Sequence, residues 1–558
     1  MPIAVVRHAG KVAAGILAAG LAFAQTLSPG PQVATFLSEV DDSDQPYGLY
    51  VPKDFDSSRT YPLVISLHGA YSNHRLNIRR LFGKGNLLGE TDAEASRYFP
   101  RFRDVEYIVA APYSRGTMGY QGIPEKDVYD VLADVKRRFP IDDDRVYLTG
   151  LSMGGGGTLW LGLTRPDIWA AIAPVCPAVP PGVEELAGNA LNLPVHLFQG
   201  EIDPVVPASA VRQWHKRLLH LDTRVEYVEY PGVRHNSWDL AYKDGAIFDL
   251  FAKSKRNRYP ERVRFATSQY KYDSAYWLKI DGLTPGVLSG IDARFTGKNQ
   301  IAVSTSGALI GFTFNLAGHP LFTATRPVIV TIDGKTLRIA RANEPVSFSR
   351  QKGNWLAARY APPKGWKRPG SEGPASEVIS SRHIYVYGTA GSQDPDELKR
   401  RHEQAAFGAE WSTSRLKLLL THRIAADRDV KDSDLQTGRA VLFGTKETNS
   451  LIAKLAPSAP IELNPGAAGF GLILVAPAGH GSVLINSGLP WWTGYDRVKR
   501  EGLRFLEGPY TVLNSFGDFI LFRGSLENVI AEGRFEPNWK VPEEAAAKMR
   551  ATGAVVVR

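Results

Sequence analysis

Cysteine is almost absent from this chain of 558 residues, and its scarcity excludes several architectures. Cys176 is the single cysteine, so the chain can form no internal disulfide and no cysteine cluster that holds a metal ion. The formal net charge is +9, yet no block of lysines and arginines stands out, so nucleic-acid binding is not indicated. The acidic run at residues 142–144 lacks the spacing of a calcium loop. We therefore predict neither a metal site nor a cofactor.

Long apolar runs are also missing, and the one short run lies at the start of the chain. Arg7 and Lys11 give a positive beginning, and an apolar stretch follows over residues 12–23. This stretch is too short for a bilayer core of about 30 Å, and small residues at 22–24 suit a signal peptidase. We expect residues 1–24 to be a signal peptide and the mature protein to be exported, periplasmic or extracellular. A retained membrane anchor is the alternative.

The rest of the chain is too long for one core, because single domains usually hold about 100–200 residues. Residues 25–260 alternate short apolar runs with helical periods, which predicts an α/β domain with a mostly parallel sheet covered by helices on both faces. Residues 261–360 are rich in strand-like runs and predict a small antiparallel β domain, with Asp333 and Gly334 in a two-residue hairpin turn.

The remaining third of the chain divides into three further segments. Residues 361–381 are rich in proline, glycine, lysine and serine, which predicts a linker. Alternating strand and helix patterns return over residues 382–540 and predict a smaller α/β domain. Residues 541–558 are expected to form a C-terminal tail.

A glycine-rich turn in the first domain carries the strongest chemical signal. Residues 150–154 read Gly-Leu-Ser-Met-Gly; they follow a predicted strand at 145–149 and open a predicted helix. In the Gly-x-Ser-x-Gly motif a sharp strand-to-helix turn exposes the serine hydroxyl, and only small neighbours leave room for it. Ser152 is therefore the predicted nucleophile of a serine hydrolase.

A serine nucleophile needs a histidine base that is oriented by an acid, and in this topology the acid precedes the histidine along the chain. Asp203 lies in the loop after a predicted strand at 195–198 and is the predicted acid, with Glu201 as its rival. His235 lies in the loop after the predicted strand at 224–230 and is the predicted base. The rival histidines are His196, His215 and His220.

Two backbone N–H groups should stabilise the negative charge that develops on the substrate oxygen. One is the N–H of Met153, directly after the nucleophile. The other is expected from the loop after the predicted strand at 61–67, where Ala70 or Tyr71 is the candidate and His68 is expected to shape the loop. The insert between Tyr71 and Arg103 adjoins this loop, and we expect it to shape the acyl pocket or to form a lid.

Several motifs follow one another in a characteristic order, at residues 67–69, 111–116, 142–145, 150–155, 203–207 and 230–235. Over residues 46–251 they resemble the α/β-hydrolase superfamily. Within it they resemble the branch that holds prolyl-oligopeptidase-type catalytic domains, feruloyl esterase-like enzymes and polyhydroxybutyrate depolymerase-like esterases. The resemblance implies an α/β-hydrolase fold and a catalytic triad of Ser152, Asp203 and His235, without naming a substrate.

The first functional prediction is a carboxylic ester hydrolase that acts through an acyl-enzyme on a small-molecule or polymer-linked ester. The large propeller of prolyl oligopeptidases has no counterpart between the predicted signal peptide and the hydrolase region, and one cysteine cannot supply the disulfides frequent in secreted polyester depolymerases. A serine peptidase with the same triad is one alternative. The other is a polysaccharide-associated esterase whose C-terminal region binds carbohydrate through aromatic rings, although core packing would explain these rings too. The rings belong to Tyr270, Tyr272, Tyr276, Trp277, Trp491 and Trp492.

Overall fold

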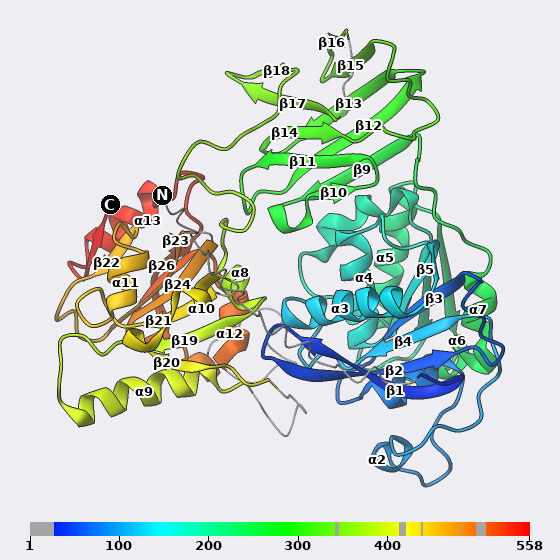
Figure 1. Cartoon of the computed structure of the whole chain (residues 1–558), viewed down its shortest axis with the longest axis horizontal. Helices are drawn as coiled ribbons and strands as arrows, with labels where there is room; N and C mark the ends of the chain where they lie inside the picture. The colour runs from blue at the N-terminus through cyan, green and yellow to red at the C-terminus, as the bar shows by residue number, and fades with distance from the viewer. Residues whose placement is uncertain (1–26, 341–344, 412–419, 437–438, 480, 498–508) are drawn as a thin grey trace, which may run out of the picture.

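The computed structural model describes residues 27–340, 345–411, 420–436, 439–479, 481–497 and 509–558. Figure 1 shows an N-terminal sheet flanked by helices (blue to teal), a green β region above it, and a yellow-to-red α/β region beside it. The predicted signal peptide lies outside the described residues. In the described part of the chain, no helix is both long and apolar enough to cross a bilayer.

The first sheet has eight strands and confirms the predicted α/β class. Strands β1 and β2 pair antiparallel with each other, β2 pairs antiparallel with β4, and the strands from β4 to β8 pair in parallel. In spatial order the strands are β1 (Gly30–Ser38), β2 (Ser43–Val51), β4 (Ile108–Pro112), β3 (Tyr61–Leu67), β5 (Ile141–Leu151), β6 (Ala171–Val175), β7 (Val195–Gly200) and β8 (Val225–Tyr230).

Alternating side chains of the central strands bury into two separate cores, one on each face of this sheet. Leu63 and Ile65 of β3 join the core that includes side chains of α3, α4 and α5, whereas Val64 joins the core that includes side chains of α1 and α7. This alternation is what a strand covered on both faces requires. The helices of this region are α1 (His74–Leu81), α2 (Asp92–Ala95), α3 (Ile123–Arg138), α4 (Met153–Thr164), α5 (Ala208–His220), α6 (Trp238–Ala241) and α7 (Ala246–Phe251).

The middle region forms two five-stranded sheets around one core. The strand pairs are antiparallel, as expected of an antiparallel β domain, apart from β13 with β15, which pair in parallel. Asp333 and Gly334 form the predicted hairpin turn, with φ values of 48° and 85°. The strands are β9 (Arg262–Thr267), β10 (Ser274–Ala275), β11 (Leu278–Leu283), β12 (Ser289–Gly297), β13 (Gln300–Ser306), β14 (Leu309–Phe314), β15 (Val328–Ile332), β16 (Lys335–Ile339), β17 (Val346–Gln351) and β18 (Asn354–Leu356).

The third region contains a seven-stranded mixed sheet in the order β20-β19-β21-β24-β23-β25-β26. Its strands are β19 (His383–Tyr387), β20 (Ile424–Ala426), β21 (Arg439–Phe443), β23 (Phe470–Ala478), β24 (Gly481–Gly488), β25 (Phe519–Arg523) and β26 (Ser525–Gly533), and β22 (Ile461–Leu463) pairs with β27 (Val555–Val557) outside it. The helices are α8 (Ala375–Ile379), α9 (Pro395–Ala409), α10 (Asp432–Gln436), α11 (Ser450–Leu455), α12 (Pro509–Ser515) and α13 (Glu543–Arg550).

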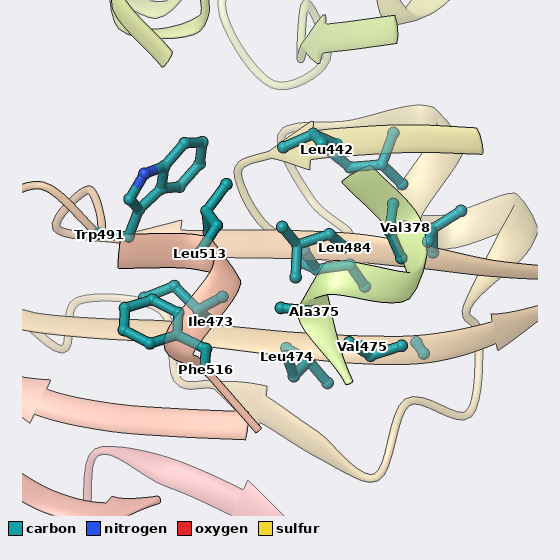
Figure 2. Packing of buried hydrophobic residues seen from close by; sticks show 14 of the residues in the cluster. Ala375, Val378, Leu442, Ile473, Leu474, Val475, Leu484, Trp491, Leu513 and Phe516 are labelled. Atoms are coloured by element: carbon teal, nitrogen blue, oxygen red, sulfur yellow. The ribbon is translucent and has the colours of Figure 1, made fainter. Parts of the chain in front are cut away.

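Two segments differ from the sequence-based expectation, because both are held by packing rather than left as connections. The end of the predicted linker forms α8, and Figure 2 shows its Ala375 and Val378 beside Leu442 and Leu484 of the third sheet. The predicted tail forms α13, which buries Met549, and strand β27. Neither segment is long or periodic enough to reveal this burial before the sheet beneath it is known.

Side chains from all three regions share cores and buried contacts. Val40, Met118 and Ile123 of the first region belong to the core of the third. Glu125 of α3 is 1% exposed and accepts a hydrogen bond of 2.7 Å from the hydroxyl of Tyr272 in the middle region. The first sheet and its helices are therefore packed directly against the two regions that follow them in the chain.

The aromatic residues considered for carbohydrate stacking lie mainly in cores. Tyr270, Tyr272 and Trp277 are at most 7% exposed, and Trp491 is fully buried. Tyr276 and Trp492 are partly buried and pack on the edges of two cores. Core packing therefore accounts for these rings, and no row of exposed aromatic faces is left among them for a polysaccharide.

Candidate active site

Ser152 stands on a sharp turn between β5 and α4. Its φ is 55°, a left-handed backbone conformation that non-glycine residues rarely adopt and that is frequent at functional sites. A Cβ at Gly150 would lie 2.4 Å from the carbonyl oxygen of Gly154, and a Cβ at Gly154 would lie 2.3 Å from that of Leu67. The glycines of the motif are thus sterically required for the turn that presents the serine hydroxyl.

The glycines after the motif let α4 pass close to the loop that follows β6. A Cβ at Gly155 would lie 2.5 Å from the carbonyl oxygen of Val175, and a Cβ at Gly156 would lie 1.9 Å from that of Ala178. Four consecutive glycines disfavour a helix by propensity, so close backbone packing beneath the nucleophile explains their presence.

We expect Gly156→Ala to lower kcat/KM for an ester at least ~10²-fold, because the start of α4 must move away from Ala178 and a shift of about 1 Å at the site has that effect. Ester turnover and far-UV circular dichroism measure activity and folding separately. Gly297→Ala is the control, since its nearest atom would lie 3.6 Å away on the Gln300 side chain. Wild-type turnover by Gly156→Ala would contradict this packing.

The structure brings Ser152, Asp203 and His235 together at the carboxyl ends of β5, β7 and β8. His235 Nε2 lies 2.9 Å from Ser152 Oγ, and His235 Nδ1 lies 2.8 Å from Asp203 Oδ2. Because an ionised carboxylate only accepts hydrogen bonds, this arrangement is satisfied when Nδ1 carries the ring proton and Nε2 accepts from the serine hydroxyl. The imidazole is then oriented to take the proton of Ser152.

The Asp203 carboxylate is fixed by four hydrogen bonds. Oδ1 accepts from the backbone N–H groups of Val205 at 2.8 Å and Val206 at 3.0 Å. Oδ2 accepts from His235 and from Gln199 Nε2 at 3.1 Å. Gln199 is the residue that sequence analysis missed, and its only signal is its place near the end of β7, just before the acid loop.

The rival groups lie away from Ser152. The carboxylate of Glu201 accepts the N–H of Gly232 at 2.8 Å and so closes the loop rather than facing His235. His196 pairs with Glu226 on the neighbouring strand β8. His215 packs on Tyr227, and His220 is exposed at the end of α5.

The expected oxyanion donors are only partly supported by the geometry. Met153 is the first residue of α4, where N–H groups have no partner within the helix. The Tyr71 N–H donates to Thr117 Oγ1 at 2.8 Å in this arrangement, so its role as an oxyanion donor stays a prediction. Ala70 remains the candidate: a Cβ at the adjacent Gly69 would lie 3.5 Å from Ser152 Cβ, so this loop passes beside the nucleophile.

His68 contacts this loop through its ring, as expected of a loop-shaping residue. Its ring is fully buried, with Nδ1 2.7 Å from the carbonyl oxygen of Gly69 and Nε2 2.8 Å from that of Tyr113. The hydroxyl of Tyr120 donates to the His68 carbonyl at 3.0 Å. The loop that carries Ala70 is therefore tied to the chain that follows β4.

Cys176 lies behind the triad, with its sulfur within 4.8 Å of ligand atoms of Asp203 and His235. It is completely buried, and burial raises the pKa of the thiol to about 12. A metal ion binds thiolate rather than thiol and would have to displace the hydrogen bond between Asp203 and His235. These groups fit a hydrogen-bonded triad better than a metal site.

The strand order, the elbow and the histidine loop have the arrangement of the α/β-hydrolase fold. The chain matches the family described as "Phospholipase/Carboxylesterase" over residues 126–244, a segment that runs from α3 to just beyond α6. This segment contains Ser152, Asp203 and His235.

Individual relatives each match less than half of the chain. The cutinase est1 of Thermobifida alba is 27% identical over 121 residues, which cover 22% of this chain and 38% of the cutinase. A thermostable esterase of known structure is 28% identical, with a TM-score of 0.33, over 40% of this chain and 63% of its own. A ferulic acid esterase from Anaeromyces mucronatus is 17% identical, with a TM-score of 0.30, over 40% of this chain and 94% of its own.

Proposed function

We propose that the protein hydrolyses carboxylic esters through an acyl-enzyme on Ser152. The observation that carries this proposal is the relay from Ser152 Oγ to His235 Nε2 and from His235 Nδ1 to Asp203, with separations of 2.9 and 2.8 Å. A nucleophile, a base within hydrogen-bond reach and a third group that orients the base are the requirements of this chemistry.

In the acylation step, Ser152 Oγ attacks the ester carbonyl carbon while His235 Nε2 takes the hydroxyl proton. The N–H groups of Met153 and Ala70 stabilise the oxyanion, and Asp203 stabilises the charged imidazole. The bond to the alcohol oxygen then breaks, and His235 returns the proton to the leaving alcohol. In deacylation, His235 takes a proton from water while the water oxygen attacks the acyl carbon. The bond from that carbon to Ser152 Oγ then breaks, His235 returns the proton to Oγ, and the free acid leaves.

Turnover of short-chain aryl esters and of aminoacyl-arylamides separates this proposal from a serine peptidase with the same triad. We expect ready hydrolysis of the aryl esters and arylamide cleavage no faster than in buffer, since the family that matches residues 126–244 is one of phospholipases and carboxylesterases. Clear arylamide cleavage with negligible ester cleavage would replace the ester proposal by a peptidase. Loss of both activities in Ser152→Ala is the control that assigns them to this site.

We infer that the chain is exported, from the positive start and short apolar run at its N-terminus. Expression of the full chain followed by N-terminal sequencing of the periplasmic and extracellular fractions tests this. The expected mature terminus is Gln25; an uncleaved chain in the membrane fraction would indicate an anchor instead.

A further inference from the structure

A solvent-open hollow of about 340 Å³ lies directly beside the catalytic histidine. Asn236 and Trp238, which follow His235 in the chain, line one side, and Arg80 of α1 lines another. The Trp238 ring meets the His235 ring edge-on at 5.5 Å, and the Arg80 guanidinium carbon lies 5.5 Å from the Trp238 ring centre. A group bound at Arg80 would thus be separated from the imidazole by one indole.

The Arg80 guanidinium is partly buried and poorly paired. Its side chain is 15% exposed, and its contacts are long, at 3.3 Å to Ser72 Oγ and 3.5 Å to Asp92 Oδ1. Five N–H donors are therefore served by two weak acceptors. Burial is also the largest influence on the pKa of Arg80 and lowers it, so the cation lacks part of its usual solvation.

The neighbouring Arg79 provides the contrast. Its side chain is 2% exposed and donates to the carbonyl oxygens of Ala95 at 2.5 Å and Gly85 at 3.0 Å. It also pairs with Glu90 at 3.2 Å. Two nitrogens of the Arg79 guanidinium thus hold the insert together, although its buried Nε has no hydrogen-bond partner among the described residues. Arg80 lines the hollow and, within the described chain, makes only two long side-chain contacts.

The two acids that face Arg80 already have partners. Asp92 accepts from Asn86 Nδ2 at 2.7 Å, and Asp239 accepts from Asn236 Nδ2 at 2.8 Å. The surrounding insert of residues 72–103 contains seven lysines and arginines against three acids, and Asp239 adds one acid to the lining of the hollow from the histidine loop. The long contacts of Arg80 leave its guanidinium able to bind an oxygen acceptor, and a carboxylate suits the planar fork of a guanidinium.

We propose that this hollow is a subsite for a carboxylate on the substrate, with Arg80 as the specificity-determining residue. The proposal rests on the proposed ester hydrolysis at Ser152. The substrate class is then an ester that bears a second, anionic carboxyl group, on either its acyl or its alcohol part. Trp238 holds the guanidinium against the histidine loop and sets its distance from the scissile bond.

Steady-state kinetics of the full chain with three aryl esters, which differ in whether and where they carry a carboxylate, test this proposal. The substrates are a neutral aryl acetate, an aryl hemiglutarate with the charge on the acyl part, and 3-carboxyphenyl acetate with the charge on the alcohol part. We expect Arg80→Gln to lower kcat/KM for at least one charged ester about 10- to 100-fold, the effect of a lost charge-assisted hydrogen bond. In Arg80→Gln, kcat/KM for the neutral ester should change by no more than about 2-fold. Asp239→Asn should raise kcat/KM for the charged ester, because it removes a like charge from the hollow.

Arg101→Gln is the matched control, because it removes the same charge from an exposed position on the same insert. Equal losses for the charged and neutral esters in Arg80→Gln would show a structural role and overturn the proposal. Unchanged values for all three esters would overturn it as well, as would equal effects of Arg101→Gln and Arg80→Gln.

Calorimetric titration with free glutarate makes the test independent of ester turnover. Wild type and Ser152→Ala should bind glutarate, and Arg80→Gln should lose at least tenfold in affinity. Binding that depends on Arg80 without any ester turnover would retain the subsite and refute the hydrolase. Ester turnover without glutarate binding, and without preference for a charged ester, would retain the hydrolase and refute the subsite.

Discussion

Ser152→Ala should lower kcat for an aryl ester by about 10⁴-fold or more while leaving the fold intact. Ser152 Oγ is the atom that attacks the ester, and it lies 2.9 Å from His235 Nε2, which takes its proton. Alanine has no hydroxyl at this position, so both the nucleophile and the proton transfer are lost. Alanine creates no steric clash in the turn, because its side chain is smaller than that of serine. Steady-state turnover together with circular dichroism provides the measurement.

Ser209→Ala, at an exposed position on α5, is the control for replacing a serine in the same region. It should keep wild-type turnover. If Ser152→Ala retained more than a tenth of the activity, the nucleophile would have to lie elsewhere, and the geometry at the elbow would have another purpose.

Asp203→Asn should lower kcat by about 10⁴-fold, nearly as much as loss of the nucleophile. The asparagine would keep two backbone donors at Oδ1, so it should remain in place, but its amide no longer fixes the imidazole with the proton on Nδ1. The double variant with Ser152→Ala should be no slower than Ser152→Ala alone, because the three groups act as a unit.

Glu201→Gln is the matched control for Asp203→Asn, since Glu201 is the neighbouring acid and its carboxylate accepts the N–H of Gly232 instead of facing His235. It should change kcat by no more than about 3-fold. A severe loss in Glu201→Gln with a mild one in Asp203→Asn would transfer the orienting role to Glu201.

The positions of Ser152, Asp203 and His235 could be predicted because each follows a strand of one parallel sheet. Parallel strands bring their carboxyl ends to the same edge, so residues distant in sequence meet there. Tyr71 could not be assigned in this way. Its N–H bonds to Thr117, which lies 46 positions later in a loop whose path depends on the whole sheet.

Dependence on contacts between residues far apart in the chain also explains which parts of the fold the sequence did not predict. The alternation of β3, β5, β6, β7 and β8 with helices indicated the parallel sheet directly. The hairpin of β1 and β2 gave no comparable signal, since the burial of its strands depends on contacts with β4 and α3. Likewise, Arg80 and Arg79 are neighbours of identical chemistry, and only the folded insert distinguishes the paired guanidinium from the poorly paired one.

Covalent labelling with a fluorophosphonate, followed by intact mass and peptide mapping, tests the central claim most directly. We expect one adduct per wild-type chain, located on Ser152, and no adduct on Ser152→Ala under the same conditions. An adduct on another residue, or equal labelling of the Ser152→Ala chain, would contradict it.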